Sequence, residues 1–183
     1  MKTESLPKYV LRLAGTLLAI CVVVAGLLAG VNAITAPIIK EQDYQKVQQA
    51  IEAVLPGGGE AVTDFTDDTG LIASVYASDV GYAFEVAPAG FGGAINMMVG
   101  VDKEGNVLGI SIVSHSETAG LGAVAAAETP KGIEFREQFV GQSGSVTVTK
   151  DGGQIDSITG ATISSRAICV GVNAALDCAA KLG

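Results

Sequence analysis

The chain has 183 residues, enough for one domain of moderate size with accessory segments. Its formal net charge of −8 argues against nucleic-acid binding, which needs basic side chains to neutralise phosphates. One histidine and three cysteines without a CxxC pattern argue against a zinc or haem site built by this chain alone, so redox chemistry here would need an organic cofactor.

The chain begins with a candidate membrane segment. Residues 13–39 are uncharged and, as a helix, would extend about 40 Å, enough to cross a hydrocarbon core of about 30 Å with some tilt. A cleaved signal peptide is the alternative, with Val31-Asn32-Ala33 as a passable cleavage site. A signal peptide has an apolar core of only about 7–15 residues. The greater length of this apolar segment therefore favours a retained membrane anchor, which would span residues 13–36.

Basic residues indicate the orientation of this anchor. Lys2, Lys8 and Arg12 precede it, and the positive-inside rule places residues 1–12 in the cytoplasm. The chain after Lys40 is then expected on the extracytoplasmic side, with a single crossing of the cytoplasmic (inner) membrane.

Residues 37–56 are predicted to form an amphipathic stalk helix. Its apolar residues recur at intervals of three and four, and Pro56 followed by three glycines ends the pattern. The stalk would lift a domain off the membrane or pack beside partner subunits. The apolar positions are Tyr44, Val47, Ile51, Val54 and Leu55.

Residues 60–183 are predicted to form an α+β domain. Short apolar runs separated by turn signals indicate an antiparallel meander, with residues 102–106 as its clearest hairpin turn. One face of this sheet is left for a helix or a ligand. The predicted strands are 71–76, 82–86, 95–101, 107–113 and 146–149, and a short helix is expected at 123–128.

The sequence from Asp156 to Arg166 combines small residues, hydroxyls and the start of the last helix. Thr162, Ser164 and Ser165 fall where the helix should begin, and its free N–H groups would favour an anion. A purely structural N-cap explains the same residues. Further along this helix, Cys169 and Cys178 are nine positions apart, so they face opposite sides and should not bridge each other.

This sequence resembles the flavinylation signature of the FMN-binding domain in the G subunit of Rnf electron-transport complexes and the C subunit of sodium-pumping NADH:quinone reductases. The signature is Asp, two variable residues, Ser or Thr, Gly, Ala, then Thr or Ser. Asp156, Thr159, Gly160, Ala161 and Thr162 match it. The resemblance implies that a flavin transferase couples FMN through its phosphate to the Thr162 hydroxyl, after recognising Asp156, Thr159, Gly160 and Ala161.

A second motif of the same families reads Glu-Thr-Pro-Gly-Leu-Gly, and residues 117–122 are similar to it, with Ala119 in place of proline. A structural strand-to-helix loop is the alternative interpretation. The resemblance implies that this loop lines the flavin pocket, and the role of the neighbouring His115 is left open. Besides Thr162, the implied FMN contacts are Glu117, Thr118, Leu121, Gly122, Thr159, Gly160, Ala161, Ser164, Ser165 and Arg166.

The expected function is that of a membrane-anchored flavoprotein subunit. The resemblance implies covalently bound FMN that relays electrons inside an Rnf-type ion-translocating ferredoxin:NAD oxidoreductase complex, with no turnover by this chain alone. The expected partners are the other membrane and redox subunits, a flavin transferase and membrane lipid. The alternatives are the C subunit of a sodium-translocating NADH:quinone reductase and a membrane-anchored binding module without redox chemistry.

Overall fold

The computed structural model of the protein describes residues 6–182. The chain divides into two compact units, residues 1–44 and 45–183. In chain order the elements are α1 (Leu6–Val54), β1 (Glu60–Val62), β2 (Ile72–Ala77), β3 (Gly81–Val86), β4 (Asn96–Asp102), β5 (Val107–Ser114), the 3-10 turn η1 (Gly122–Ala126), α2 (Pro130–Glu137), the 3-10 turn η2 (Thr149–Asp151) and α3 (Thr162–Leu182).

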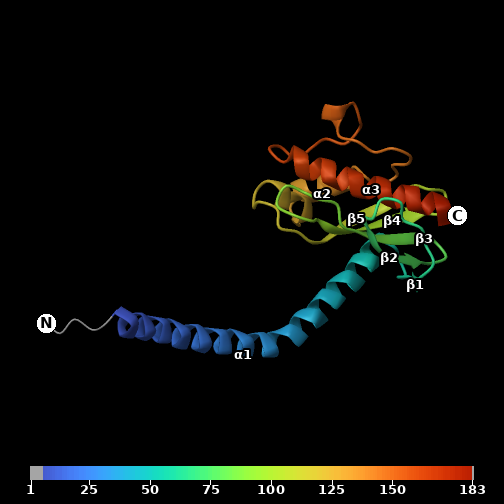
Figure 1. Ribbon diagram of the computed structural model, residues 1–183. Helices are drawn as coiled ribbons and strands as arrows, with labels where there is room; N and C mark the ends of the chain where they lie inside the picture. The colour runs from blue at the N-terminus through green and yellow to red at the C-terminus, as the bar shows by residue number, and fades with distance from the viewer. Residues whose placement is uncertain (1–5, 183) are drawn as a thin grey trace. The chain divides into compact units, whose positions relative to one another are not determined.

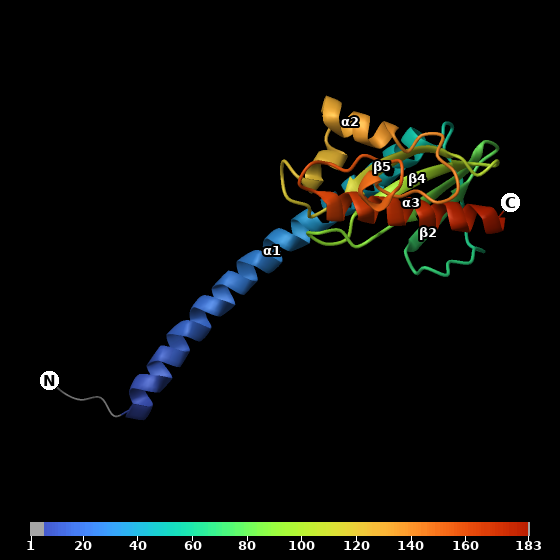
Figure 2. The ribbon, with the colours of Figure 1, turned by 90° about the horizontal axis from the view of Figure 1, so that it is seen from above.

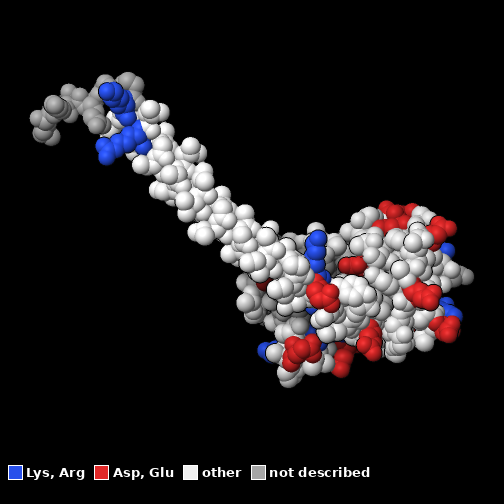
Figure 3. Space-filling model, turned by 90° about the horizontal axis from the view of Figure 1, so that it is seen from below, with Lys and Arg blue, Asp and Glu red and all other residues white. Residues whose placement is uncertain are grey.

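The first unit is the exposed, apolar part of α1. Figure 3 shows basic side chains near one end of this helix and an uncharged surface along its length. The hydroxyls of Thr16 and Thr35 donate back to the carbonyls of Leu13 and Val31, at 2.9 and 3.0 Å, so these polar groups are satisfied within the helix. The segment is long and apolar enough to cross a membrane. Lys2, one of the residues used to predict its orientation, lies outside the described residues.

The second unit is built on a five-stranded antiparallel sheet with the strand order β1-β2-β3-β4-β5 (Figure 1). This arrangement confirms the predicted α+β fold and meander, and adds the short edge strand β1. The β4–β5 hairpin turns where the sequence predicts it. Its turn is held by Asp102, whose Oδ1 accepts a hydrogen bond from the Asn106 N–H at 2.7 Å.

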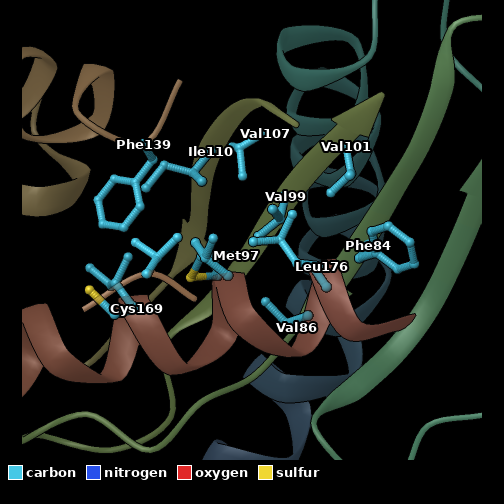
Figure 4. Close-up of a cluster of buried hydrophobic side chains, with 14 of the residues drawn as sticks. Phe84, Val86, Met97, Val99, Val101, Val107, Ile110, Phe139, Cys169 and Leu176 are labelled. Atoms are coloured by element: carbon cyan, nitrogen blue, oxygen red, sulfur yellow. The ribbon is translucent and has the colours of Figure 1, made fainter. Parts of the chain in front are cut away.

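The main core lies between one face of the sheet and α3. Figure 2 shows α3 running along the sheet, and Figure 4 shows Val86, Met97 and Val99 pointing toward Leu176 of this helix. These side chains are buried and apolar, so the burial drives α3 onto the sheet. The helix passes the same length and hydropathy criteria as a membrane span, but most of it is buried in this core.

The opposite face of the sheet is covered by the end of α1. Ile51, Val54 and Leu55 are buried there against Ala83 and Met98. The close approach depends on Gly100, where an added Cβ would lie 2.2 Å from the Val54 carbonyl oxygen. The last turns of the predicted stalk therefore form part of the folded domain.

One local expectation is wrong. Residues 146–149 do not form a strand: the Asn173 side chain accepts the Val146 N–H at 2.8 Å and donates to its carbonyl at 2.9 Å, which satisfies the groups that a strand partner would use. Within residues 146–149, only Val148 pairs as a strand residue would, through an isolated parallel bridge to Ile155. The short helix expected at 123–128 is present as the 3-10 helix η1, at Gly122–Ala126.

Candidate functional site

A pocket of about 310 Å³ forms where the two sequence motifs meet. The loop after β5 supplies one wall and the start of α3 supplies the other. A third side comes from Phe91, in the glycine-rich loop between β3 and β4, and from Lys150 in η2. The lining residues are Phe91, Glu117, Thr118, Leu121, Gly122, Lys150, Gly160, Ala161, Thr162, Ile163 and Ser164.

The local backbone exposes the start of α3 to this pocket. Gly160 has φ of 78°, a left-handed conformation that favours glycine, and the chain turns there into the helix. The first helical hydrogen bond runs from the Ser165 N–H to the Ala161 carbonyl at 3.0 Å. The N–H groups of residues 162–164 precede it, so they remain free at the positive end of the helix dipole.

Ser165 has a structural role in this turn. Its buried hydroxyl donates to the Ala161 carbonyl at 3.0 Å and accepts the Ile158 N–H at 3.1 Å. Both bonds hold the segment before the helix against its first turn. The serine does not line the pocket.

Thr162 is the first residue of α3, and its hydroxyl has a cationic partner. The ammonium of Lys150 donates a hydrogen bond to Thr162 Oγ1 at 2.8 Å. Lys150 belongs to neither sequence motif and was not among the site residues predicted from the sequence. The sequence shows a lysine followed by Asp151 and two glycines, a pattern typical of an exposed turn. Because twelve positions separate Lys150 from Thr162, this pattern does not indicate that the two side chains meet.

Arg166 lies beside the pocket and pairs with Asp151. Its Nε and one terminal nitrogen donate to the two Asp151 oxygens, each at 2.7 Å. These hydrogen bonds, together with the positive charges of Arg166 and Lys150, hold the Asp151 pKa below its ordinary value, and the same pair raises the pKa of Arg166. The ion pair ties η2 to the first turn of α3.

Glu117 connects three segments around the pocket. It is only 9% exposed, and its carboxylate accepts hydrogen bonds from the Ser164 hydroxyl at 2.6 Å and the Gly92 N–H at 3.0 Å. Burial by itself raises the Glu117 pKa. The bonds from Ser164 and from the Gly92 and Phe91 N–H groups outweigh burial and hold the pKa below its ordinary value.

Glycines make room for this buried carboxylate. A Cβ at Gly122 would lie 2.3 Å from Glu117 Oε2 and 2.6 Å from Ser164 Oγ, and one at Gly90 would lie 2.2 Å from Glu117 Oε1. His115 supports the same loop, because its Nδ1 accepts the Glu117 N–H at 3.2 Å. The glycines next to Glu117 therefore have a packing reason in addition to any contact with a ligand.

The predicted site residues separate into two groups. Eight of them line the pocket: Glu117, Thr118, Leu121, Gly122, Gly160, Ala161, Thr162 and Ser164. Thr159, Ser165, Arg166 and Asp156 lie outside its lining. Asp156 is exposed, and its backbone is bonded to the Gln138 side chain at 2.6 and 3.3 Å, which leaves its carboxylate facing solvent.

The pocket suits a ligand with a flat apolar ring and an anionic end. Phe91, Leu121 and Ile163 are 69%, 42% and 52% exposed, so apolar surface is available for a ring system. The Lys150 ammonium and the helix N-terminus supply the positive end. FMN fits this combination, because its isoalloxazine ring is flat and largely apolar and its phosphate is anionic.

Two protein-family models match the chain. The FMN-binding domain model matches residues 90–177, which include every residue of the pocket. The model of the RnfG N-terminal region matches residues 1–54, the whole of α1 included.

Curated relatives align over most of their length. The G subunit of the ion-translocating oxidoreductase complex of Vibrio cholerae serotype O1 (strain M66-2) is 31% identical over 91% of this chain and 89% of its own. The G subunit of the complex of the same name from Methanosarcina acetivorans is 32% identical, over 93% of this chain and 94% of its own. The G subunit of the Na(+)-translocating ferredoxin:NAD(+) oxidoreductase complex of Acetobacterium woodii is 32% identical, over 93% of this chain and 91% of its own. With this identity over nearly its full length, the chain belongs to the family of G subunits of Rnf-type ion-translocating oxidoreductase complexes.

Proposed function

We propose that this protein is a membrane-anchored flavoprotein subunit that relays electrons through FMN within an Rnf-type ion-translocating ferredoxin:NAD oxidoreductase complex. The observation that carries the proposal is the convergence of the two flavin-family motifs on one pocket, with the Thr162 hydroxyl in its lining. The match of residues 1–54 and the names of the relatives favour the Rnf family over the C subunit of a quinone reductase. We expect no turnover by the chain alone.

The FMN is proposed to be attached covalently, through a phosphodiester to Thr162 Oγ1. Thr162 is half-buried at the helix N-terminus, where the N–H groups of residues 162–164 are available for phosphate oxygens. Phe91, Leu121 and Ile163 offer apolar surface to the ring, and Thr118 offers a hydroxyl to its polar edge. Bound FMN supplies the redox chemistry through its isoalloxazine, while the protein holds it in place and sets its surroundings.

Maturation by a flavin transferase is part of the proposal. The exposed carboxylate of Asp156 is free to be recognised by another protein, because only the backbone of Asp156 is used in the fold. Gly160 and Ala161, which have no bulky side chain, leave the approach to Thr162 open. Thr159 is exposed one residue before this turn.

The first unit is proposed to be a retained membrane anchor. Lys8 and Arg12 stand at the N-terminal end of the apolar part of α1, so the positive-inside rule places them in the cytoplasm. Lipid would surround the exposed apolar side chains of residues 13–36. The pocket, in the second unit, is then on the extracytoplasmic side, where a covalent bond prevents loss of the flavin by dissociation.

The test is to produce the full chain together with a flavin transferase and to inspect it on a denaturing gel. Flavin fluorescence and the corresponding mass increment should stay with the wild-type chain and be absent from Thr162→Val. The variant should remain folded, because it loses about 0.5–2 kcal/mol at most from a cap interaction. Ser164→Ala and Ser165→Ala are the matched hydroxyl deletions and should retain the increment. Covalent FMN on Thr162→Val would overturn the assignment.

A further inference from the structure

The partner of the Thr162 hydroxyl is a charged group from a different element. Lys150 lies in η2, and its ammonium bonds to Thr162 Oγ1 at 2.8 Å inside the pocket. The other cation near the start of α3, Arg166, has its guanidinium directed to Asp151 by two bonds of 2.7 Å. Lys150 is therefore the cation that the fold places on the proposed attachment atom.

The backbone of η2 is held so that Lys150 is presented at this place. The Thr149 N–H donates to the Ile155 carbonyl at 2.8 Å, and Gly152 ends the turn with φ of 84°. Gly153 permits a close crossing, since a Cβ there would lie 2.2 Å from the Thr147 carbonyl oxygen. The Asp151–Arg166 pair then ties the turn to α3. A flexible lysine side chain thus starts from a fixed backbone.

We propose that Lys150 is the positioning residue for flavin attachment at Thr162 and afterwards the counter-ion of the attached phosphate; this inference rests on the covalent attachment proposed above. Its N–H group occupies a lone pair of Oγ1, which orients the hydroxyl and leaves the hydroxyl hydrogen free to be removed by a base of the transferase. The ammonium stabilises the negative charge that develops on Oγ1 as the proton leaves.

The bond changes balance with an activated flavin dinucleotide as co-reactant. Thr162 Oγ1 forms a bond to the flavin-side phosphorus, the pyrophosphate bond of the dinucleotide breaks, and a nucleoside monophosphate leaves. The hydroxyl proton passes to the transferase. Once Oγ1 is an ester oxygen it is a poor acceptor, and the Lys150 ammonium is then in reach of the non-bridging phosphate oxygens, with which it forms a charge-assisted bond.

The test measures attachment directly. Purified full-length apoprotein in detergent is incubated with a flavin transferase and a flavin dinucleotide, and the fraction of chains that gain the FMN mass is followed over time. Lys150→Met keeps the aliphatic stem and loses the charge, and we expect it to slow attachment about tenfold or more, the size expected for loss of one charge-assisted hydrogen bond. Lys150→Arg should recover a large part of the rate. Lys131→Met, an exposed lysine outside the pocket lining, should match the wild type.

A second measurement separates positioning from a general effect on the fold. In the fully attached proteins, the ³¹P resonance of the diester should differ between the wild type and Lys150→Met but not between the wild type and Lys131→Met. Circular dichroism melting should give all four proteins similar Tm values, because Lys150 is exposed. Equal attachment rates and equal ³¹P shifts in the wild type and Lys150→Met would overturn the role of Lys150. Absence of attachment in the wild type would instead overturn the covalent function itself.

Discussion

The Ser164 hydroxyl donates a hydrogen bond of 2.6 Å to Glu117 Oε2, across 47 positions of the chain. This bond joins the loop after β5 to the first turn of α3, and the other oxygen of the same carboxylate accepts the Gly92 N–H. One buried side chain therefore sets the relative positions of three segments that line the pocket. Ser164, one of the FMN contacts that the resemblance implies, has its hydroxyl hydrogen directed to Glu117.

The stability supplied by Glu117 should depend on pH in a defined direction. Its folded-state pKa lies below 4.5, so the ionised form is favoured by folding. This contribution is fully present above the unfolded-state pKa and is lost as the pH falls through the folded-state value. Glu117→Gln keeps the shape and removes the charge, and it replaces one accepting oxygen by an NH2 group: the amide oxygen can still accept the Gly92 N–H, while the amide nitrogen can only donate to Ser164 Oγ. We expect the Tm advantage of the wild type over Glu117→Gln at pH 7 to shrink as the pH falls from about 4.5 toward 3.

The control for this measurement is Glu134→Gln, which changes an exposed carboxylate outside the pocket. The pKa values of Asp67 and Asp102 are also lowered, so protonation of these carboxylates in acid destabilises the wild type and both variants alike. Only the difference in Tm between the wild type and Glu117→Gln therefore reports on Glu117. A difference in Tm that stays constant from pH 7 to pH 3 would contradict the prediction.

The pocket lining should influence the spectrum of the flavin. Thr118→Val removes a hydroxyl from the lining and Phe91→Leu removes an exposed aromatic face, so each should leave the FMN attached but shift its absorption maximum or its reduction potential. Thr63→Val, an exposed threonine outside the pocket, serves as the control. If both pocket variants have the spectrum and potential of the wild type, the ring lies elsewhere.

The sequence was sufficient to predict the sheet because strand periodicity is a local signal. The four longer strands and the turn at Asp102 are found within one or two residues of their predicted places. β1 was missed because it has only three residues, and its pairing with β2 supplies the evidence that its sequence lacks. Val146 and Val148 have strand-like spacing, but the Asn173 side chain, 27 positions away, takes the backbone groups of Val146.

The same distinction applies to the site. The motif residues could be placed from a resemblance, whereas Lys150 and Phe91 belong to no motif and enter the pocket only through the tertiary fold. Arg166 illustrates the reverse case: the resemblance implied an FMN contact, but a carboxylate from another segment faces its guanidinium. Side-chain partners across long separations are not encoded in local spacing.

The orientation of the anchor gives a prediction on accessibility. Protease added to cells stripped of an outer membrane should cleave the domain after Lys40, while the same protease added to right-side-out vesicles should leave residues 1–12 intact. An antibody tag at each end reports which fragment survives. Cleavage of the domain only in inverted vesicles would place the pocket in the cytoplasm and contradict extracytoplasmic attachment of the flavin.

The two cysteines of α3 should be unreactive in the folded protein. Burial raises the pKa of Cys169 from 9.0 to about 11, and burial together with the nearby negative charge of Asp67 raises that of Cys178. At pH 8 the Cys169 thiolate is about a hundredfold scarcer than for an ordinary thiol. A Cys21→Ala chain in detergent should therefore take up almost no maleimide until denaturant is added, when it should take up two equivalents. Rapid labelling in the native state would show that α3 is not packed as described.

The last prediction concerns the packing of the α1 end on the sheet. Gly100 on β4 and Gly109 on β5 are directly paired, and both lie near Val54. A Cβ at Gly100 would lie 2.2 Å from the Val54 carbonyl oxygen, which is backbone and cannot rotate away, whereas a Cβ at Gly109 would meet only Val54 Cγ1 at an ordinary 3.9 Å. We expect Gly100→Ala to destabilise the domain by about 1–3 kcal/mol through overpacking, and Gly109→Ala to change stability by less than about 1 kcal/mol. Denaturant unfolding of the full chain, monitored by circular dichroism, measures the stability of both variants.

A second measurement localises the effect of Gly100→Ala. Because residues 45–55 supply buried side chains on this face of the sheet, Gly100→Ala should also increase amide hydrogen exchange in residues 45–55, with little change in α3. Equal stability of the two variants would mean that the end of α1 is not seated against β4.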